Sequence, residues 1–185
     1  MIECQDVSFS YPASTLPDSE RQAGGALKHI SCTIEDGSFV LLCGTSGCGK
    51  TTMTRLFNGL IPHYHEGTYT GSVYLDGKDT RDLSLFDISL KVGSVFQNPR
   101  SQFFNVDTTS ELAFGPENHG IEEDLVRDRV KRVAAQLKLE PLLDRSIFSL
   151  SGGEKQKIAC GSAAAIDPDI YVLDEPSSNL DAYAI

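Results

Sequence analysis

Residues 44–51 read GTSGCGKT, which matches the phosphate-loop pattern G-x-x-x-x-G-K-[ST] at every fixed position. Glycines let such a loop fold tightly around an anion, so that successive backbone N–H groups point inward. A helix is expected from about Lys50 to Asn58, and its dipole would add positive potential at the loop. The Lys50 amino group would neutralise the β- and γ-phosphates, and the Thr51 hydroxyl would be a ligand of Mg²⁺.

The stretch therefore predicts a nucleoside triphosphate site at a strand-to-helix turn. The residues expected to contact the nucleotide there are Gly44, Thr45, Ser46, Gly47, Cys48, Gly49, Lys50, Thr51 and Thr52.

The apolar run FVLLC at residues 39–43 leads directly into this loop. A continuous apolar run bounded by Gly37 and Gly44 predicts a strand buried on both faces, as in a parallel sheet covered by helices. Further upstream, apolar alternation over residues 2–9 predicts an edge strand, and a second strand is expected over 27–34. An exposed connection over residues 13–25 would join these two strands.

Downstream of the loop, apolar spacing predicts further elements of both kinds. Strands are expected at 71–77, 92–96 and 170–173, the last two buried, and helices at 124–139 and from Ser151 to about Ile166. The strand at 170–173 ends on Asp174 and Glu175. Asp174 would hold Mg²⁺, and Glu175 is placed to polarise an attacking water.

The composition limits the kinds of partner. Of 185 residues, 16 are Lys or Arg and 26 are Asp or Glu, giving a net charge of −10. This acidity argues against nucleic acid or an anionic lipid surface as a partner, so any phosphate site must be local. No apolar run approaches the roughly 20 residues of a bilayer span, and Met1 opens no secretory signal pattern, so a cytoplasmic protein without direct membrane insertion is expected.

The five cysteines are an odd number without a Cys-x-x-Cys spacing, which predicts reduced thiols. Helix N-termini and lysines activate cysteines, so Cys48 is expected to be the most reactive of the five. His63 and His65 are interpreted as part of a solvated loop because Glu66 is their only nearby acidic neighbour.

A second anion site is indicated by LSGGEKQ at residues 150–156. Ser151 is a good helix N-cap, and the two glycines after it would open backbone donors at the start of a helix. One nucleotide needs only one phosphate loop, so this second site is interpreted as serving the nucleotide of a partner subunit in a head-to-tail pair.

The same stretch resembles the signature motif of ATP-binding cassette (ABC) ATPases, and the resemblance covers essentially the whole chain. Gln97 matches the glutamine loop, residues 178–181 match the loop after the second nucleotide motif, and Tyr11 matches the aromatic that lies on adenine. The resemblance implies ATP and Mg²⁺ as ligands, with Gln97 joining Thr51 and Asp174 as metal ligands. Its implied catalytic residues are Glu175, Gln97 and Lys50, and its implied contacts to nucleotide outside the phosphate loop are Tyr11, Ser151, Gly152, Gly153, Glu154 and Asp181.

The fold implied by this resemblance is α/β. It has a phosphate-loop NTPase core with a mainly parallel sheet, an N-terminal antiparallel β subdomain and an inserted α-helical subdomain. Residues 1–97 and 167–185 would form the nucleotide-binding core with the β subdomain, and residues 98–166 the helical subdomain. The family's γ-phosphate-sensing histidine lies beyond residues 178–181, so the resemblance also implies that this sequence is a fragment truncated at its C-terminus.

Residues 95–118 look like the ATPase subunits of energy-coupling factor transporters, which import vitamins or ions such as cobalt and nickel. That resemblance implies a contact from about Gln97 to Asn118 with a transmembrane transporter component, on the cytoplasmic face of the membrane. Phe103 and Phe104 would be either anchors of this contact or core residues of the helical insertion.

The leading hypothesis is an ATP-hydrolysing subunit that powers a membrane importer, paired with a second ABC ATPase subunit or domain. One alternative is a soluble ABC ATPase that acts as an ATP-driven switch. A phosphate-loop nucleotide kinase is the other alternative, and it would leave residues 150–154 unexplained.

Overall fold

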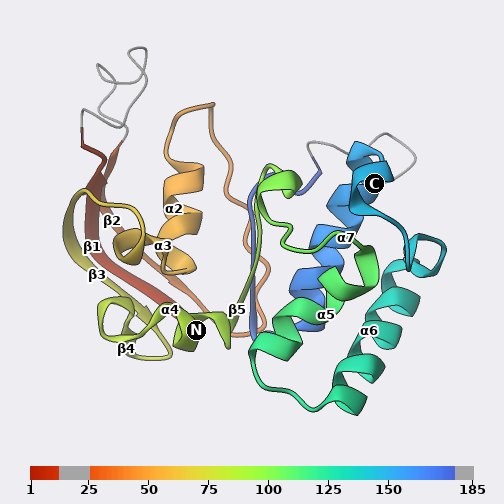
Figure 1. Cartoon of the computed structure of the whole chain (residues 1–185). Helices are drawn as coiled ribbons and strands as arrows, with labels where there is room; N and C mark the ends of the chain where they lie inside the picture. The colour runs from red at the N-terminus through yellow and green to blue at the C-terminus, as the bar shows by residue number, and fades with distance from the viewer. Residues whose placement is uncertain (13–25, 178–185) are drawn as a thin grey trace. The chain divides into compact units, whose positions relative to one another are not determined.

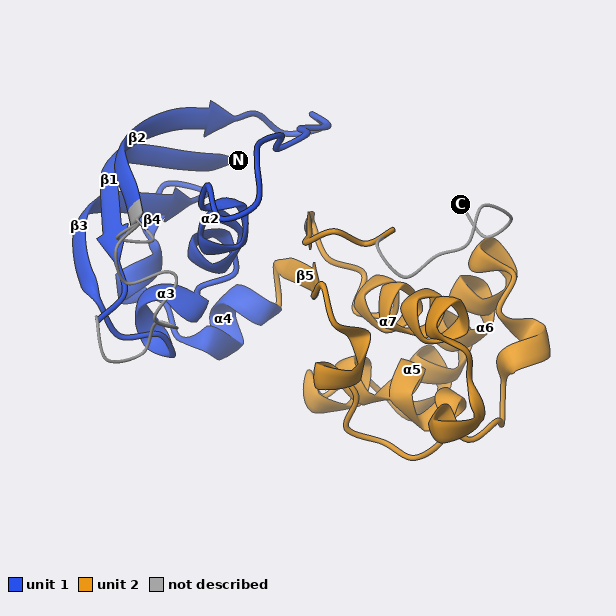
Figure 2. Cartoon of the chain, turned by 90° about the horizontal axis from the view of Figure 1, so that it is seen from above, with its two compact units in different colours: residues 1–89 blue, residues 90–185 orange. Residues whose placement is uncertain are grey.

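The computed structural model describes residues 1–12 and 26–177, which belong to two compact units, Met1–Ser89 and Leu90–Ile185 (Figures 1 and 2). The first unit holds an antiparallel sheet with short helices, and the second holds a parallel strand pair with three longer helices. The expected division into a core and a helical subdomain at residues 97/98 and 166/167 stays a prediction. The connection expected over residues 13–25 lies outside the described residues.

The sheet of the first unit has the strand order β2-β1-β3-β4, with every neighbouring pair antiparallel. Its strands are β1 (Ile2–Ser10), β2 (Ala26–Ile34), β3 (Thr68–Leu75) and β4 (Lys78–Asp79). The prediction that residues 2–9 form an edge strand is wrong, because β3 pairs with the side of β1 that β2 leaves open. The register shift between Cys4 and Val7 explains the imperfect alternation, since a bulge there returns both side chains to the buried face.

In the described part of this unit, three short helices accompany the sheet: α2 (Lys50–Phe57), α3 (Leu60–His63) and α4 (Leu85–Ser89) (Figure 1). Helix α2 confirms the predicted helix after the phosphate loop. It buries Met53, Leu56 and Phe57, which join Val7 and Phe9 of β1 among the buried apolar residues of the unit. A helix this short is only marginally stable by itself, so the burial of these apolar side chains stabilises it.

The predicted buried strand at residues 39–43 is wrong. These residues form no strand, and the Phe39 side chain is 91% exposed. A strand needs hydrogen-bonded neighbours to satisfy its backbone, and no described strand pairs with this run. The apolar composition of the run is typical of a buried strand. Burial also requires partner strands, however, and the sequence of the run does not specify them.

In the second unit, β5 (Val92–Val95) pairs in parallel with β6 (Ile170–Leu173). The parallel pairing agrees with the predicted α/β class. Strand β5 is largely buried as predicted, but Tyr171 on β6 is 51% exposed and only Val172 of that strand is buried. Full burial of β6 was therefore wrong, because among the described strands β5 is its one neighbour.

Three helices build the core of this unit: α5 (Thr108–Asn118), α6 (Glu123–Leu137) and α7 (Gly152–Ala165) (Figure 1). The predicted helices at 124–139 and 151–166 are confirmed with small boundary changes. Leu112 of α5 and Ile158 of α7 share one apolar cluster with Leu139. A Cβ at Gly161 would lie 2.6 Å from Leu139 Cδ1, so glycine is needed for this close approach.

No helix in residues 1–12 and 26–177 has both the length and the apolar character required to cross a bilayer.

A buried carboxylate ties the loop before α5 to the helix. Glu111 is almost fully buried, and its Oε2 accepts bonds from the backbone N–H of Phe104 at 3.0 Å and of Asn105 at 2.8 Å. The Asn105 side-chain amide also donates to it, at 3.3 Å. One side chain thus satisfies two part-buried backbone donors. Removing this acceptor would leave both donors unsatisfied and would lower the stability of the fold.

We expect Glu111→Ala to lower the free energy of unfolding by about 2 kcal/mol or more, because it leaves these donors without their acceptor. Glu111→Gln keeps an acceptor oxygen and should lose clearly less. Urea denaturation followed by circular dichroism measures both variants. Equal losses for the two would contradict the assigned role of the carboxylate.

Candidate functional site

The phosphate loop of the first unit ends at Gly49, which is the N-cap of α2. Gly49 offers no side-chain cap, and the first turn of the helix contains no acidic residue. The Lys50 ammonium folds back over the loop and donates to the carbonyls of Gly44 at 3.0 Å and of Thr45 at 3.1 Å. Helix donors without a side-chain acceptor, next to a cation, are the donor set that binds a phosphate chain.

Glycine suits two positions of this loop, by its backbone freedom at Gly49 and by its lack of a side chain at Gly44. Gly49 has a φ of 102°, in the left-handed region, and a Cβ there would lie 2.8 Å from Leu27 Cδ2. A Cβ at Gly44 would lie 2.5 Å from Cys48 Sγ. The residues present therefore fit a nucleotide's phosphates, since the backbone itself, and not side chains, lines the turn.

Tyr11 follows β1 in the same unit and is partly exposed. Its hydroxyl accepts a hydrogen bond of 2.8 Å from Nη1 of Arg55 on α2. The ring of Phe9 meets the Tyr11 ring edge-on, with centroids 4.8 Å apart. The predicted adenine-stacking residue is thus hydrogen-bonded to the helix that begins at the phosphate loop.

The second unit brings Gln97 and Glu175 together, although they are 78 positions apart in the sequence. Gln97 Nε2 donates to Glu175 Oε2 at 2.8 Å. Asp174 is buried, and its backbone N–H donates to the Val95 carbonyl at 2.9 Å. These residues follow the carboxyl ends of β5 and β6, where open parallel sheets place their ligand sites.

The signature stretch begins α7 with a capping box. The Ser151 hydroxyl accepts from the Glu154 N–H at 3.2 Å, and Glu154 Oε2 accepts from the Ser151 N–H at 2.7 Å. Hydrogen bonds from the Ser151 backbone and hydroxyl, with Arg145 nearby, lower the pKa of Glu154. Glu154 is therefore a carboxylate at neutral pH. The prediction of Ser151 as N-cap is confirmed.

Sequence reasoning missed several supporting residues. The pattern S-x-x-E at residues 151–154 signals a capping box and could have assigned Glu154 its structural role. The contact from Arg55 to Tyr11 has no such local signal, because 44 positions separate the two residues. Asp181 and the loop at 178–181 lie outside the described residues.

The structure assembles two sets of predicted site residues, each within its own unit. Residues 44–51 and Tyr11 belong to the first unit, and Gln97, Asp174, Glu175 and Ser151 belong to the second. In the described part of the chain, no three His, Cys, Asp or Glu residues gather as a ready metal site. Oxygen ligands from hydroxyl, amide and carboxylate groups are nevertheless the types that Mg²⁺ prefers.

A phosphate loop leading into α2, a capped glycine-rich signature at the start of α7, an antiparallel sheet in the first unit and a parallel strand pair with helices in the second are the features of an α/β ATP-binding cassette. The family model described as ABC transporter matches residues 27–178, and the chain belongs to this family. The predicted family and fold class are thereby confirmed.

Several relatives carry the name of an ABC transporter ATP-binding protein. A protein of Treponema denticola is 49% identical over all 185 residues, which make up 36% of its own length. A protein of Pyrococcus horikoshii is 45% identical over 184 residues, covering 98% of this chain and 61% of the relative. The chain thus spans about a third of the Treponema relative.

Solved structures share the same fold. The ATP-binding cassette MJ0796, described as a dimer in a post-hydrolysis state bound to ADP and Pi, has a TM-score of 0.80 and 25% identity. That match covers 100% of this chain and 78% of the other. The protein cbiO1 of Clostridium perfringens, described as part of the ABC transporter complex cbiONQ, has a TM-score of 0.77 and 27% identity, covering 99% and 68%.

We expect iodoacetamide to label the exposed Cys43 and Cys48 first, and ATP to protect Cys48, which lies within the phosphate loop. Cys4 should react far more slowly, because burial with Cys32 beside it raises the pKa of Cys4 to about 12. Mass spectrometry after limited alkylation gives the order of labelling. Equally fast labelling of Cys48 with and without ATP would contradict the proposed loop contact.

Proposed function

We propose that the protein is the ATP-binding and ATP-hydrolysing subunit of a membrane importer of the energy-coupling factor type, which takes up vitamins or cobalt and nickel ions. The observation that carries this proposal is the start of α2. Its backbone donors lack a side-chain cap, and Lys50 is held over the loop by the Gly44 and Thr45 carbonyls. Such a start is suited to the phosphates of ATP.

The importer type is supported by the likeness to cbiO1, which is described as part of an ABC transporter complex. It is supported also by the sequence of residues 95–118, on which the energy-coupling factor resemblance rests. In this proposal the protein works peripherally, on the cytoplasmic face of the membrane.

Each unit contributes its own groups to the chemistry. In the first, Lys50 neutralises phosphate charge, Thr51 supplies a hydroxyl to Mg²⁺ and Tyr11 stacks on adenine. In the second, Asp174 and the Gln97 amide oxygen act as metal ligands, and Glu175 polarises the attacking water. The bond from Gln97 to Glu175 orients that carboxylate.

The signature residues serve a partner. We assign Ser151, Gly152, Gly153 and Glu154, together with Asp181, to the nucleotide of a second ABC ATPase subunit or domain in a head-to-tail dimer. Ser151 and Gly152 are exposed at the start of α7, as such a contact requires. The likeness to MJ0796, described as dimeric, supports this pairing.

The contact with the transmembrane component is assigned to about Gln97–Asn118. Phe104 is 74% exposed and stacks on Phe114 of α5, with centroids 4.8 Å apart and ring planes 16° apart. Phe103, in contrast, packs against the apolar clusters of the helical unit. Of the two alternatives for these residues, Phe103 therefore takes the core role, and Phe104 is the proposed anchor.

We expect the Glu175→Gln variant to sediment as a dimer with Mg-ATP and as a monomer without it, since blocking hydrolysis traps the nucleotide-bound pair. Adding Ser151→Arg should abolish the dimer by placing a bulky side chain on the signature surface. Ser110→Arg, an exposed serine in the first turn of α5, is the matched control and should leave the dimer intact.

A variant that binds ATP and stays monomeric would contradict the shared-site dimer. A variant that binds no ATP would contradict the nucleotide site itself.

We expect Phe104→Ala to weaken retention of the full-length protein on its membrane complex, with ATP-driven dimerisation unchanged. The physical reason is the loss of an exposed aromatic face that a partner would bury. Co-purification from detergent-solubilised membranes measures retention, and Phe148→Ala, another exposed phenylalanine of the second unit, is the control. Equal retention of the Phe104 variant and the wild type would refute the assigned anchor.

A further inference from the structure

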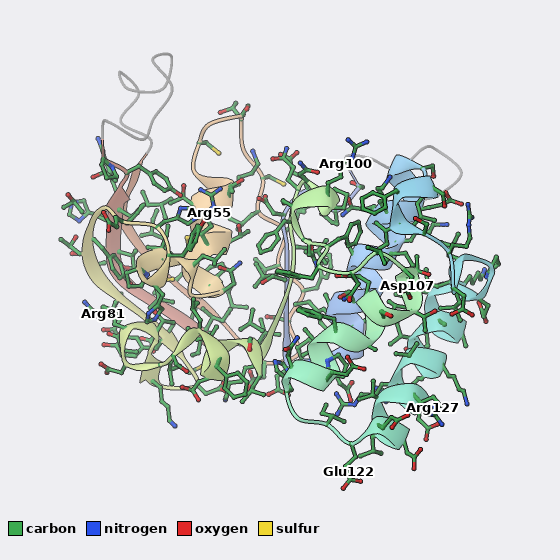
Figure 3. The ribbon with its side chains drawn as sticks, in the orientation of Figure 1. Arg55, Arg81, Arg100, Asp107, Glu122 and Arg127 are labelled. Atoms are coloured by element: carbon green, nitrogen blue, oxygen red, sulfur yellow. The ribbon has the colours of Figure 1, made fainter. Side chains whose placement is uncertain are left out.

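Side chains from two other segments of the first unit contact Tyr11. Besides the 2.8 Å bond to its hydroxyl, the Arg55 guanidinium carbon lies 5.9 Å from the Tyr11 ring centroid. The ring of His65 meets Tyr11 edge-on, with centroids 6.0 Å apart and planes at 87°. Figure 3 labels Arg55, which projects from α2. The tyrosine is thus fixed at its hydroxyl by one residue and at its ring by another.

This end of the sheet is also the end that lies at the phosphate loop. Phe9, two residues before Tyr11, is paired in register with Leu27 of β2. The Leu27 side chain reaches so close to Gly49 that a Cβ there would lie 2.8 Å from it. Arg55 is five residues after Lys50 on α2, about 7.5 Å along the helix axis. Tyr11 and the phosphate loop are therefore coupled through both β2 and α2.

His65 faces Arg55 and Tyr11 as an uncharged ring. Burial, and then the positive charge of Arg55, lower the pKa of His65. A second edge-on contact, with Tyr64 at 5.0 Å between centroids, restrains the imidazole on its own segment. A neutral ring held in this way can pack against the tyrosine without repelling the guanidinium beside it.

We propose that Arg55 and His65 are positioning residues that hold the ring of Tyr11 ready for the nucleobase, so that they set the affinity for the base and not for the phosphates. This inference rests on the proposed function, in which Tyr11 stacks on adenine. Holding an aromatic ring before the ligand arrives removes an ordering cost that binding would otherwise meet.

The proposal assigns recognition of the base and recognition of the phosphates to different residues. Two probes measure these two contributions independently. ATP contacts both sites, whereas inorganic tripolyphosphate carries only the charge that the phosphate loop recognises. Isothermal titration calorimetry with each probe, on the complete chain with Mg²⁺, measures the two affinities.

Tyr11→Ala should weaken ATP binding about tenfold, the scale of one base–aromatic stack, and leave tripolyphosphate binding within about twofold. Arg55→Met and His65→Ala should each weaken ATP binding about fivefold, the scale of one lost side-chain contact, again without changing tripolyphosphate binding. His65→Phe keeps an aromatic edge against Tyr11 and should restore most of the affinity for ATP.

A matched control is available in the same unit. Arg81 lies beside a different tyrosine, with its guanidinium carbon 5.5 Å from the Tyr69 centroid, and Figure 3 labels it apart from Arg55. Arg81→Met should change neither affinity. In a Tyr11→Ala background, Arg55→Met should add no further loss of ATP affinity, because a positioning residue acts only through the group it positions.

Unchanged ATP affinity in Arg55→Met and His65→Ala, or equal losses for ATP and tripolyphosphate, would overturn the inference while leaving the nucleotide site in place. A wild-type chain that binds neither probe would instead overturn the proposed function, and this inference with it. The two failures are therefore distinct.

Discussion

The start of α2 is the constraint on which the site depends. An α-helix leaves its first backbone N–H groups without partners, and a side-chain cap is the ordinary remedy. In this chain, Asp107 caps α5 and Ser151 caps α7, but Gly49 gives α2 no side-chain acceptor. A missing cap costs a helix about 1 kcal/mol, and here it coincides with a lysine held over the same turn. Among the described helices, α3 and α6 also begin without a side-chain cap, so what distinguishes α2 is that Lys50 is held over the same turn as the open backbone donors.

Sequence patterns predicted those features that depend on nearby residues. Helices α2, α6 and α7 follow from apolar spacing and from their end signals, and strand β2 from alternation. Burial was less predictable, because it depends on neighbours from elsewhere in the chain. The run at 39–43 and strand β6 have the composition of buried strands, yet Phe39 and Tyr171 are exposed. The central place of β1 likewise depends on pairing with β3, about 65 positions away in sequence.

The candidate site divides in the same way. Motifs identified Lys50, Gln97 and Glu175, because their chemistry is tied to fixed spacing within short stretches. The bond between Gln97 and Glu175 was not visible in those stretches, since it forms only where the ends of two parallel strands meet. The neighbours Phe103 and Phe104 show the limit of composition as a guide. Phe103 packs into the helical core, whereas Phe104 is exposed. Their different positions follow from the backbone conformation that Glu111 holds by accepting from the Phe104 N–H.

Two carboxylates of the second unit, Glu111 and Glu154, show how the same chemical group can serve different purposes. Glu111 is buried, and it fixes a loop by accepting hydrogen bonds from the backbone N–H groups of Phe104 and Asn105. Glu154 closes the capping box at the exposed start of α7, where it binds the Ser151 N–H and pairs with Arg145. The Ser151 hydroxyl accepts from the Glu154 N–H and also hydrogen-bonds the Glu154 carboxylate, so both residues of the box hold each other in place. The capping box thus fixes the orientation of the serine at the exposed start of α7.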